Sequence, residues 1–202
     1  MDEARLGWRS GQSFGDASRH NKTLGTARVG GPLAVEESAE RKSVMKDKYE
    51  RLYKKAKNIM EDKTPLKKDC GLLCDKACCK GDSETGMLLF PYEQTTLDVI
   101  EKDGVRLCVC DGSCDREQRP LSCMIFPFFP YITPEGRIKV IPDIRGGEIC
   151  PVVRNFTETR LDRRFLRRVK KVGRFLAQDE ECRAFIEGIS REMDVYIELS
   201  SK

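Results

Sequence analysis

Histidine is almost absent from this 202-residue chain, which contains only His20. A zinc-protease motif of the HExxH type is therefore excluded, because it needs two histidines one helical turn apart. The sequence also lacks a P-loop and the GxGxxG fingerprint of dinucleotide binding. These absences remove three common catalytic arrangements, and whether the protein is an enzyme stays open.

Long apolar runs are absent as well. No stretch approaches the roughly 18 apolar residues that a membrane-spanning helix needs. The first residues, Met1–Trp8, lack the apolar segment of a secretory signal. We therefore expect a cytoplasmic protein with no membrane partner. In that compartment thiols stay reduced, and a cluster of cysteines more often binds metal than forms disulfides.

Material for a hydrophobic core is scarce, since apolar residues make up 39% of the chain, charged residues 35% and aromatic residues 7%. A core this thin needs a cross-link, which cysteines supply through a metal ion or a disulfide. The chain has ten cysteines, and nine of them lie between residues 70 and 150. These nine are the candidate metal ligands: Cys70, Cys74, Cys78, Cys79, Cys108, Cys110, Cys114, Cys123 and Cys150.

The donor set limits the choice of metal. Because His20 lies in the N-terminal tail, the ligands would be almost all thiolates, with a carboxylate such as Asp69 or Asp111 as a further candidate. Soft sulfur ligands select zinc, Cu(I) or iron–sulfur clusters over magnesium and calcium. Four thiolates hold one zinc ion or one cluster, so eight would serve two. We expect zinc or iron, including an iron–sulfur cluster, as the cofactor.

The first cysteine group has the spacing C-x3-C-x3-C-C. Cysteines four residues apart lie on the same side of a helix, so Cys70, Cys74 and Cys78 are able to converge. Cys79 points about 100° away from Cys78 in a helix and to the opposite face in a strand. The adjacent pair therefore predicts two metal sites side by side, or one cluster with a separate site beside it.

The hydrophobic pattern predicts an α+β protein with four parts. A disordered tail over 1–34 precedes an amphipathic helix over 35–64, and a cysteine-cluster core over 65–155 precedes a helical pair over 156–202 that packs on the core. The first helix has an apolar stripe with i, i+4, i+7 spacing. The residues of that stripe are Met45, Tyr49, Leu52, Ala56 and Ile59.

Short elements are expected within the core. The chain from Thr85 to Pro91 is typical of a buried strand, and residues 96–102 of a short helix. The alternation in Val105–Cys110 predicts a strand with Cys108 and Cys110 on one face. A hairpin should join 125–132 to 137–141. The aromatic residues around Phe126 form either a lid over the metal site or a surface for a partner or ligand.

The C-terminal part has the strongest helical periodicity. A helix is expected over 157–177, with Thr159-x-x-Asp162 as a capping box at its start. A second helix should begin near Asp179. Cys182 falls on the apolar stripe of that second helix, so we interpret it as a buried thiol rather than a ligand. The two stripes are Leu161, Phe165, Val169, Val172 and Leu176, then Cys182, Phe185, Ile186, Ile189, Met193, Tyr196 and Ile197.

The cysteine core resembles the YkgJ-type cysteine-cluster family, a zinc- or iron-chelating domain. The likeness rests on Cys70–Cys79 with its adjacent pair, then Leu88-x-Phe90-Pro91 with Glu93, then Arg119-Pro120 with Cys123 and Phe126-Pro127. It covers about residues 66–151. The resemblance implies a metal-binding domain and leaves the ion and any reaction open.

Three functions follow as hypotheses. The first is a metal-binding protein whose zinc or iron is structural or carried. The second is an iron–sulfur or redox protein, or an accessory to an enzyme, by analogy with cysteine-rich segments of flagellin lysine methylases. The third is an interaction module in which the basic residues of 160–174 bind nucleic acid or an acidic protein, although the net charge of +4 is below that of a dedicated nucleic-acid binder.

Overall fold

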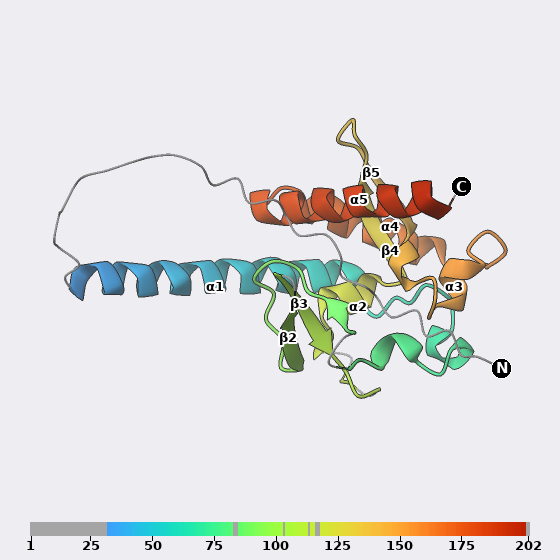
Figure 1. The fold of residues 1–202 in the computed structure, drawn as a ribbon, viewed down its shortest axis with the longest axis horizontal. Coiled ribbons are helices and arrows are strands. Elements are labelled where there is room, and N and C mark those ends of the chain that lie inside the picture. The colour runs from blue at the N-terminus through green and yellow to red at the C-terminus, as the bar shows by residue number, and fades with distance from the viewer. Residues whose placement is uncertain (1–31, 83–84, 103, 113, 116–117, 201–202) are drawn as a thin grey trace. The chain divides into compact units, whose positions relative to one another are not determined.

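The computed structural model describes residues 32–82, 85–102, 104–112, 114–115 and 118–200. The chain divides into two units, Met1–Lys42 and Ser43–Lys202, and the second contains every side chain discussed below. Most of the tail predicted over 1–34, with His20, lies outside the described residues. Figure 1 shows the order of the elements.

The helix predicted over 35–64 is α1, Pro32–Met60. Within the second unit its buried face consists of Tyr49, Tyr53, Ala56 and Met60, each at most 3% exposed. The predicted stripe included Tyr49 and Ala56 but missed the other two. Tyr53 buries its ring because its hydroxyl finds a partner inside, donating to the carbonyl of Pro91 at 2.6 Å.

A small antiparallel sheet follows the first cysteine group. It consists of β1 (Met87–Leu88), β2 (Asp98–Lys102) and β3 (Val105–Val109), in the order β1-β3-β2. The strand predicted at 105–110 is confirmed, but the helix predicted over 96–102 is wrong, because that segment pairs along its length with β3. Gly104, with φ of 78°, provides the left-handed turn that such a tight hairpin needs.

The predicted hairpin is β4 (Phe128–Ile132) with β5 (Ile138–Pro142), paired antiparallel with Pro130 opposite Val140. Its first strand begins later than expected, because Leu121–Ile125 forms a short helix, α2, that the sequence pattern did not predict. Phe128 and Phe129 are 3% and 4% exposed, so the interpretation of these two rings as an exposed partner surface is wrong.

Three helices complete the chain: α3 (Pro151–Arg154), α4 (Arg163–Leu176) and α5 (Glu180–Ser200). The start of α4 differs from the prediction. Asp162 caps the helix by accepting from the backbone N–H of Arg164 at 2.8 Å, whereas the hydroxyl of Thr159 donates to the carbonyl of Asn155. The capping box at Thr159 is therefore wrong, and one capping carboxylate replaces it.

The hydrophobic core lies where α4 and α5 pack on the β4–β5 hairpin (Figure 1). The predicted stripe of α5 is buried at Cys182, Ile186, Ile189 and Met193 and partly buried at Phe185, but Tyr196 and Ile197 are 40% and 44% exposed. The mixture of helices and antiparallel sheets agrees with the α+β class. Among the most buried apolar side chains of the core are Tyr49, Met60, Phe90, Leu121, Phe165, Val169, Val172, Leu176, Ile186 and Met193.

Candidate metal centre

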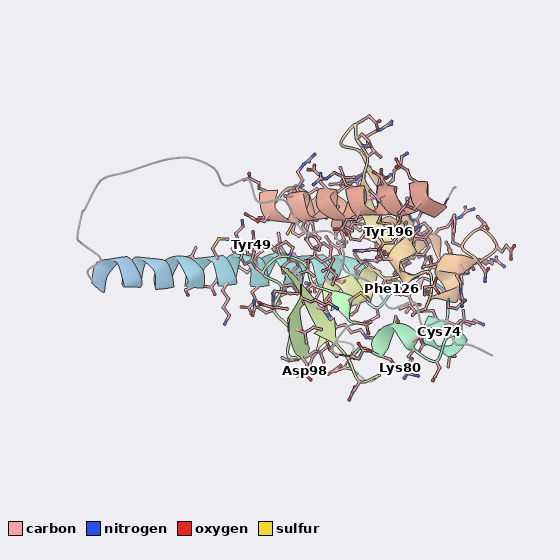
Figure 2. The ribbon with its side chains drawn as sticks, in the orientation of Figure 1. Tyr49, Cys74, Lys80, Asp98, Phe126 and Tyr196 are labelled. Carbon is pink, nitrogen blue, oxygen red and sulfur yellow. The ribbon has the colours of Figure 1, made fainter. Side chains whose placement is uncertain are left out.

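The first cysteine group lies in two short 3-10 turns, η1 (Cys70–Leu73) and η2 (Ala77–Cys79). Asp69 caps the first turn by accepting from the N–H of Gly71 at 2.9 Å. Asp75 and Lys76 then reverse the chain with φ of 48° and 54°. The helical spacing on which the expected convergence of Cys70, Cys74 and Cys78 rested is therefore interrupted between the two turns. Figure 2 labels Cys74 and Lys80 in this segment.

Four thiols form a first group, named here thiol group A: Cys70, Cys74, Cys78 and Cys150. Burial, followed by the charges of Cys150, Asp69 and Cys74, raises the pKa of Cys70 to about 11. The pKa of Cys78 is raised mainly by its hydrogen bond with Cys79, by burial and by the charge of Cys79, and then by the charges of Cys74 and Cys70. Burial raises the pKa of Cys150, and the charge of Cys74 adds to that rise. Cys150 precedes α3 and is buried as a member of the hydrophobic core.

Five thiols form a second group, thiol group B: Cys79, Cys108, Cys110, Cys114 and Cys123. The pKa of Cys108 is raised to about 11, mainly by burial and then by the charge of Cys110. Burial raises the pKa of Cys123 further, helped by the charges of Cys108, Cys79 and Cys114. The group thus unites η2, β3 and α2.

Cys78 and Cys79 stand where the two groups meet, with their sulfur atoms 4.0 Å apart. The hydrogen bond between them lowers the pKa of Cys79, assisted by the positive charges of Arg119 and Lys76. The two thiols therefore interact directly with each other, and the two metal sites expected from their adjacency remain a prediction.

Backbone pairing brings η2 beside the end of β3. The N–H of Gly81 donates to the carbonyl of Cys110 at 2.8 Å, and Lys80 forms a bridge with Asp111. This approach needs glycine, because a Cβ at Gly81 would lie 2.8 Å from the carbonyl oxygen of Thr85. The contact places Cys79 near Cys110, although 30 residues separate them.

Arg119 brings a positive charge into thiol group B. Its guanidinium is half-buried, and Nε donates to the sulfur of Cys114 at 3.3 Å. The charges of Cys79 and Cys123 also act on this guanidinium. A cation that donates to sulfur offsets the negative charge that gathered thiolates accumulate.

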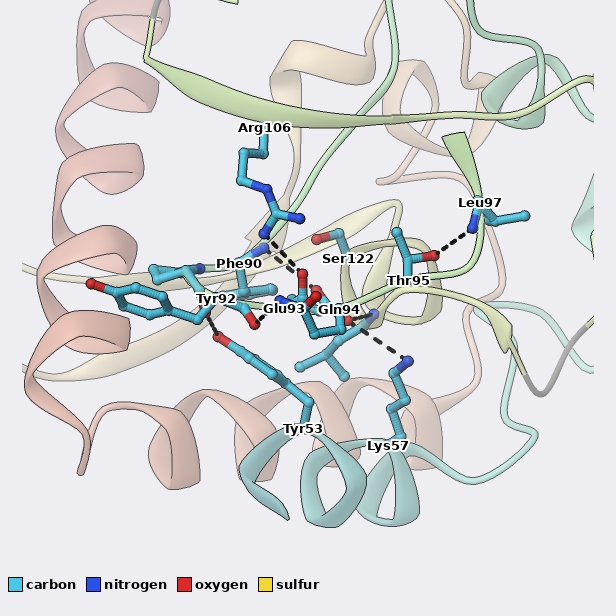
Figure 3. Close-up of polar contacts among 12 residues, drawn as sticks. Tyr53, Lys57, Phe90, Tyr92, Glu93, Gln94, Thr95, Leu97, Arg106 and Ser122 are labelled. Atoms are coloured by element: carbon cyan, nitrogen blue, oxygen red, sulfur yellow. Dashed lines mark hydrogen bonds and ion pairs between the residues drawn. The ribbon is translucent and has the colours of Figure 1, made fainter. Parts of the chain in front are cut away.

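Glu93 is a functional candidate that sequence reasoning noted only through the family resemblance. Its side chain is fully buried, and Figure 3 shows contacts from three parts of the chain meeting there. Oε1 accepts from the N–H of Leu121 at 2.7 Å and lies 3.8 Å from Nζ of Lys57. Arg106 donates to the backbone carbonyl of Glu93 at 2.9 Å.

The position of Glu93 has a consequence for the thiols. Leu121 begins α2, the helix that carries Cys123, so the carboxylate caps the element that presents a member of thiol group B. Burial raises the pKa of Glu93, while the hydrogen bonds and Lys57 oppose that rise. We interpret Glu93 as the residue that positions α2 against α1 and β3.

Cys182 stands apart from both thiol groups. It is fully buried in α5, and its sulfur lies 3.3 Å from the hydroxyl of Tyr53. Burial raises its pKa to about 12. The predicted burial of Cys182 is therefore confirmed.

All ten cysteines are free thiols in the structure. Across the part of the chain that the structure describes, no three Cys, His, Asp or Glu side chains are arranged so that they could hold a metal ion as they stand. None of the described helices is long and apolar enough to cross a membrane. Comparisons of the chain with family models, curated proteins and solved structures found no match.

Proposed function

We propose that this chain is a metal-binding protein that holds zinc or iron through thiolates of groups A and B. The observation that carries the proposal is the meeting of cysteine segments at η2, where the sulfur atoms of Cys78 and Cys79 lie 4.0 Å apart and the next residues pair with the chain just after β3. Group A supplies the four thiolates that one tetrahedral ion or one cluster needs, and group B supplies that number with one to spare.

The donor chemistry supports a soft metal. The nine core cysteines offer sulfur ligands, which makes magnesium or calcium unsuitable, since both prefer oxygen ligands. The proposal requires the sulfur atoms of each group to draw together when the ion binds. Such a movement is available to the first cysteine group, because η1 and η2 contain no buried residue.

The resemblance to the YkgJ-type zinc- or iron-chelating family supports the same assignment, and membership of that family is part of the proposal. Its Arg-Pro-x-x-Cys segment corresponds here to Arg119, whose guanidinium contacts Cys114, and to Cys123. We propose that the bound ions hold the cysteine segment in its fold or are carried by it.

Metal analysis of anaerobically purified protein tests the proposal. We expect about two ions per chain if each group holds one tetrahedral ion. Zinc would leave the protein colourless, whereas charge-transfer absorption would identify an iron–sulfur protein and favour the redox hypothesis. Protein without stoichiometric metal, with its core thiols paired as disulfides, would overturn the proposal.

Single Cys→Ser variants then separate the two groups. Cys78→Ser should lose the metal of group A, and Cys123→Ser that of group B, each with the local fold. The matched control is Cys182→Ser, which removes a buried thiol of neither group and should keep the full metal content. A control variant that loses metal would show that the assigned ligands are wrong.

A further inference from the structure

Helix α4 carries cations on its outward face. Over its 14 residues it has seven Arg or Lys side chains and no Asp or Glu. At about 100° per residue, the exposed ones fall within roughly a third of the helix circumference. We call this surface the cationic face, and its exposed members are Arg163, Arg164, Arg167, Lys171 and Arg174.

Packing fixes this face toward solvent. The opposite side of α4 buries Phe165, Val169 and Leu176 in the core. Gly173 also lies against the hairpin so closely that a Cβ there would be 2.3 Å from Cβ of Pro130. The helix therefore cannot rotate its cations inward without losing its contact with β4.

No carboxylate among the described residues forms an ion pair with any member of the cationic face. The nearby Glu61 pairs instead with the half-buried Arg168, at 2.8 Å. The neighbouring α5 differs, since it has six acidic and two basic residues. An ordinary solvated helix mixes both signs as α5 does, so α4 carries an uncompensated charge.

A second basic segment adjoins the start of α4. The N–H of Asp162 donates to the carbonyl of Pro65 at 2.8 Å, which ties the loop after α1 to the cap of α4. The same loop carries the exposed Lys67 and Lys68. Positive charge thus continues from the cationic face onto an adjoining segment.

We propose that the cationic face of α4 binds the phosphate backbone of a nucleic acid. Four of its five members are arginines, which bind phosphate with two parallel hydrogen bonds. An amphipathic membrane-surface helix would need exposed apolar residues beside its cations, but the apolar side of α4 is buried. A protein interface would have an apolar centre that this face lacks. Backbone contacts of this kind position a nucleic acid without reading its sequence.

Fluorescence anisotropy with the metal-loaded full chain tests this proposal. The probes are a DNA duplex and an RNA hairpin of roughly 20 base pairs, about two helical turns. We expect binding at low salt with a slope of log K against log salt of about −4 to −5 on the duplex, because five cations displace counterions. The triple variant R163E/R167E/K171E should bind more than about 100-fold more weakly at about 50 mM salt.

The matched control is K46E/K54E/K55E, which makes the same change in net charge at exposed lysines of α1. The control should keep its affinity within about threefold, since its lysines lie outside the cationic face. Equal losses in both variants would show that only net charge matters and would overturn the proposal. Absence of binding to either probe at low salt, or binding only to anionic vesicles or an acidic peptide, would also overturn it. Neither result depends on which metal the chain holds.

Discussion

The first cysteine group and the C-terminal helical pair differ in how deeply their side chains are buried. Helices α4 and α5 bury a continuous apolar stripe, and Phe165, Ile186 and Met193 are at most 1% exposed. The turns η1 and η2 bury no residue, and Leu72 is 77% exposed. Apolar packing therefore accounts for the helical pair but not for these two turns, where the proposed metal would supply the cross-link.

Removal of the metal should produce the largest difference in stability between the two regions. In zinc-dependent domains the ion contributes about 10–16 kcal/mol, so we expect the segments around Cys70–Cys79 and Val105–Cys110 to lose amide-exchange protection on chelation. Residues 165–193 should keep theirs, because their stability comes from packing. Hydrogen exchange by mass spectrometry makes the measurement, under anaerobic conditions. Uniform loss across both regions would contradict the comparison.

A cavity in the helical pair should lower the stability of the fold without releasing metal. Phe165→Ala removes a ring that is 1% exposed, at an expected cost of about 3–5 kcal/mol in the free energy of unfolding. Metal content per folded molecule should not change. Phe156→Ala is the matched control, since that ring is 44% exposed and its loss should cost about 0.5 kcal/mol or less. Urea denaturation with metal analysis tests both variants, and metal loss in Phe165→Ala would count against independent regions.

Arg119 should affect group B without affecting group A. Arg119→Gln removes the cation that donates to Cys114, and changes to residues around metal ligands typically cost 10–100-fold in affinity, so we expect roughly that loss at one of two sites. Competition with a chromophoric chelator measures it. Arg137→Gln, at an arginine exposed on the hairpin, is the control. Equal weakening of both sites would show that Arg119 acts through the fold as a whole.

Glu93 should make the smallest contribution to the free energy of unfolding, and this contribution should depend on pH. Burial raises its pKa above the ordinary value of 4.5, so the folded state binds its proton more tightly than the unfolded chain. The stability from Glu93 is therefore greatest below about pH 4.5 and is lost as pH rises through the raised pKa. Glu93→Gln keeps an acceptor for Leu121 and cannot ionise.

The stability of the Glu93→Gln variant relative to the natural protein should consequently increase with pH. Urea denaturation of both proteins from about pH 4 to about pH 9 tests this, and the comparison cancels the effect of pH on the other groups. A stability difference that stays constant over that range would show that Glu93 has the same pKa in the folded and unfolded states.

Local periodicity predicted the elements that depend least on distant partners. The stripe from Phe165 to Leu176 specifies α4, because a 14-residue amphipathic pattern repeats often enough to identify one face. Short segments were harder to predict from local periodicity. Residues 98–102 are equally compatible with a helical turn and a strand, and only their pairing with β3 decides between them.

The missed helix α2 shows the same limit. It has five residues, too few for periodicity to reveal, and its first N–H is capped by Glu93, 28 residues earlier in the chain. Similarly, the buried face of α1 differs from the predicted one at Tyr53. That ring is buried because Pro91 offers its carbonyl, a partner that the sequence of the helix does not contain.

The sequence by itself determined the thiol-rich character of this protein, with nine cysteines between residues 70 and 150 and two of them adjacent at Cys78 and Cys79. It also determined the run of cations without acids along α4. Only the tertiary structure decided that Gly81 pairs with Cys110 and that Glu93 caps α2. These contacts join segments far apart in the chain, and no local pattern encodes them.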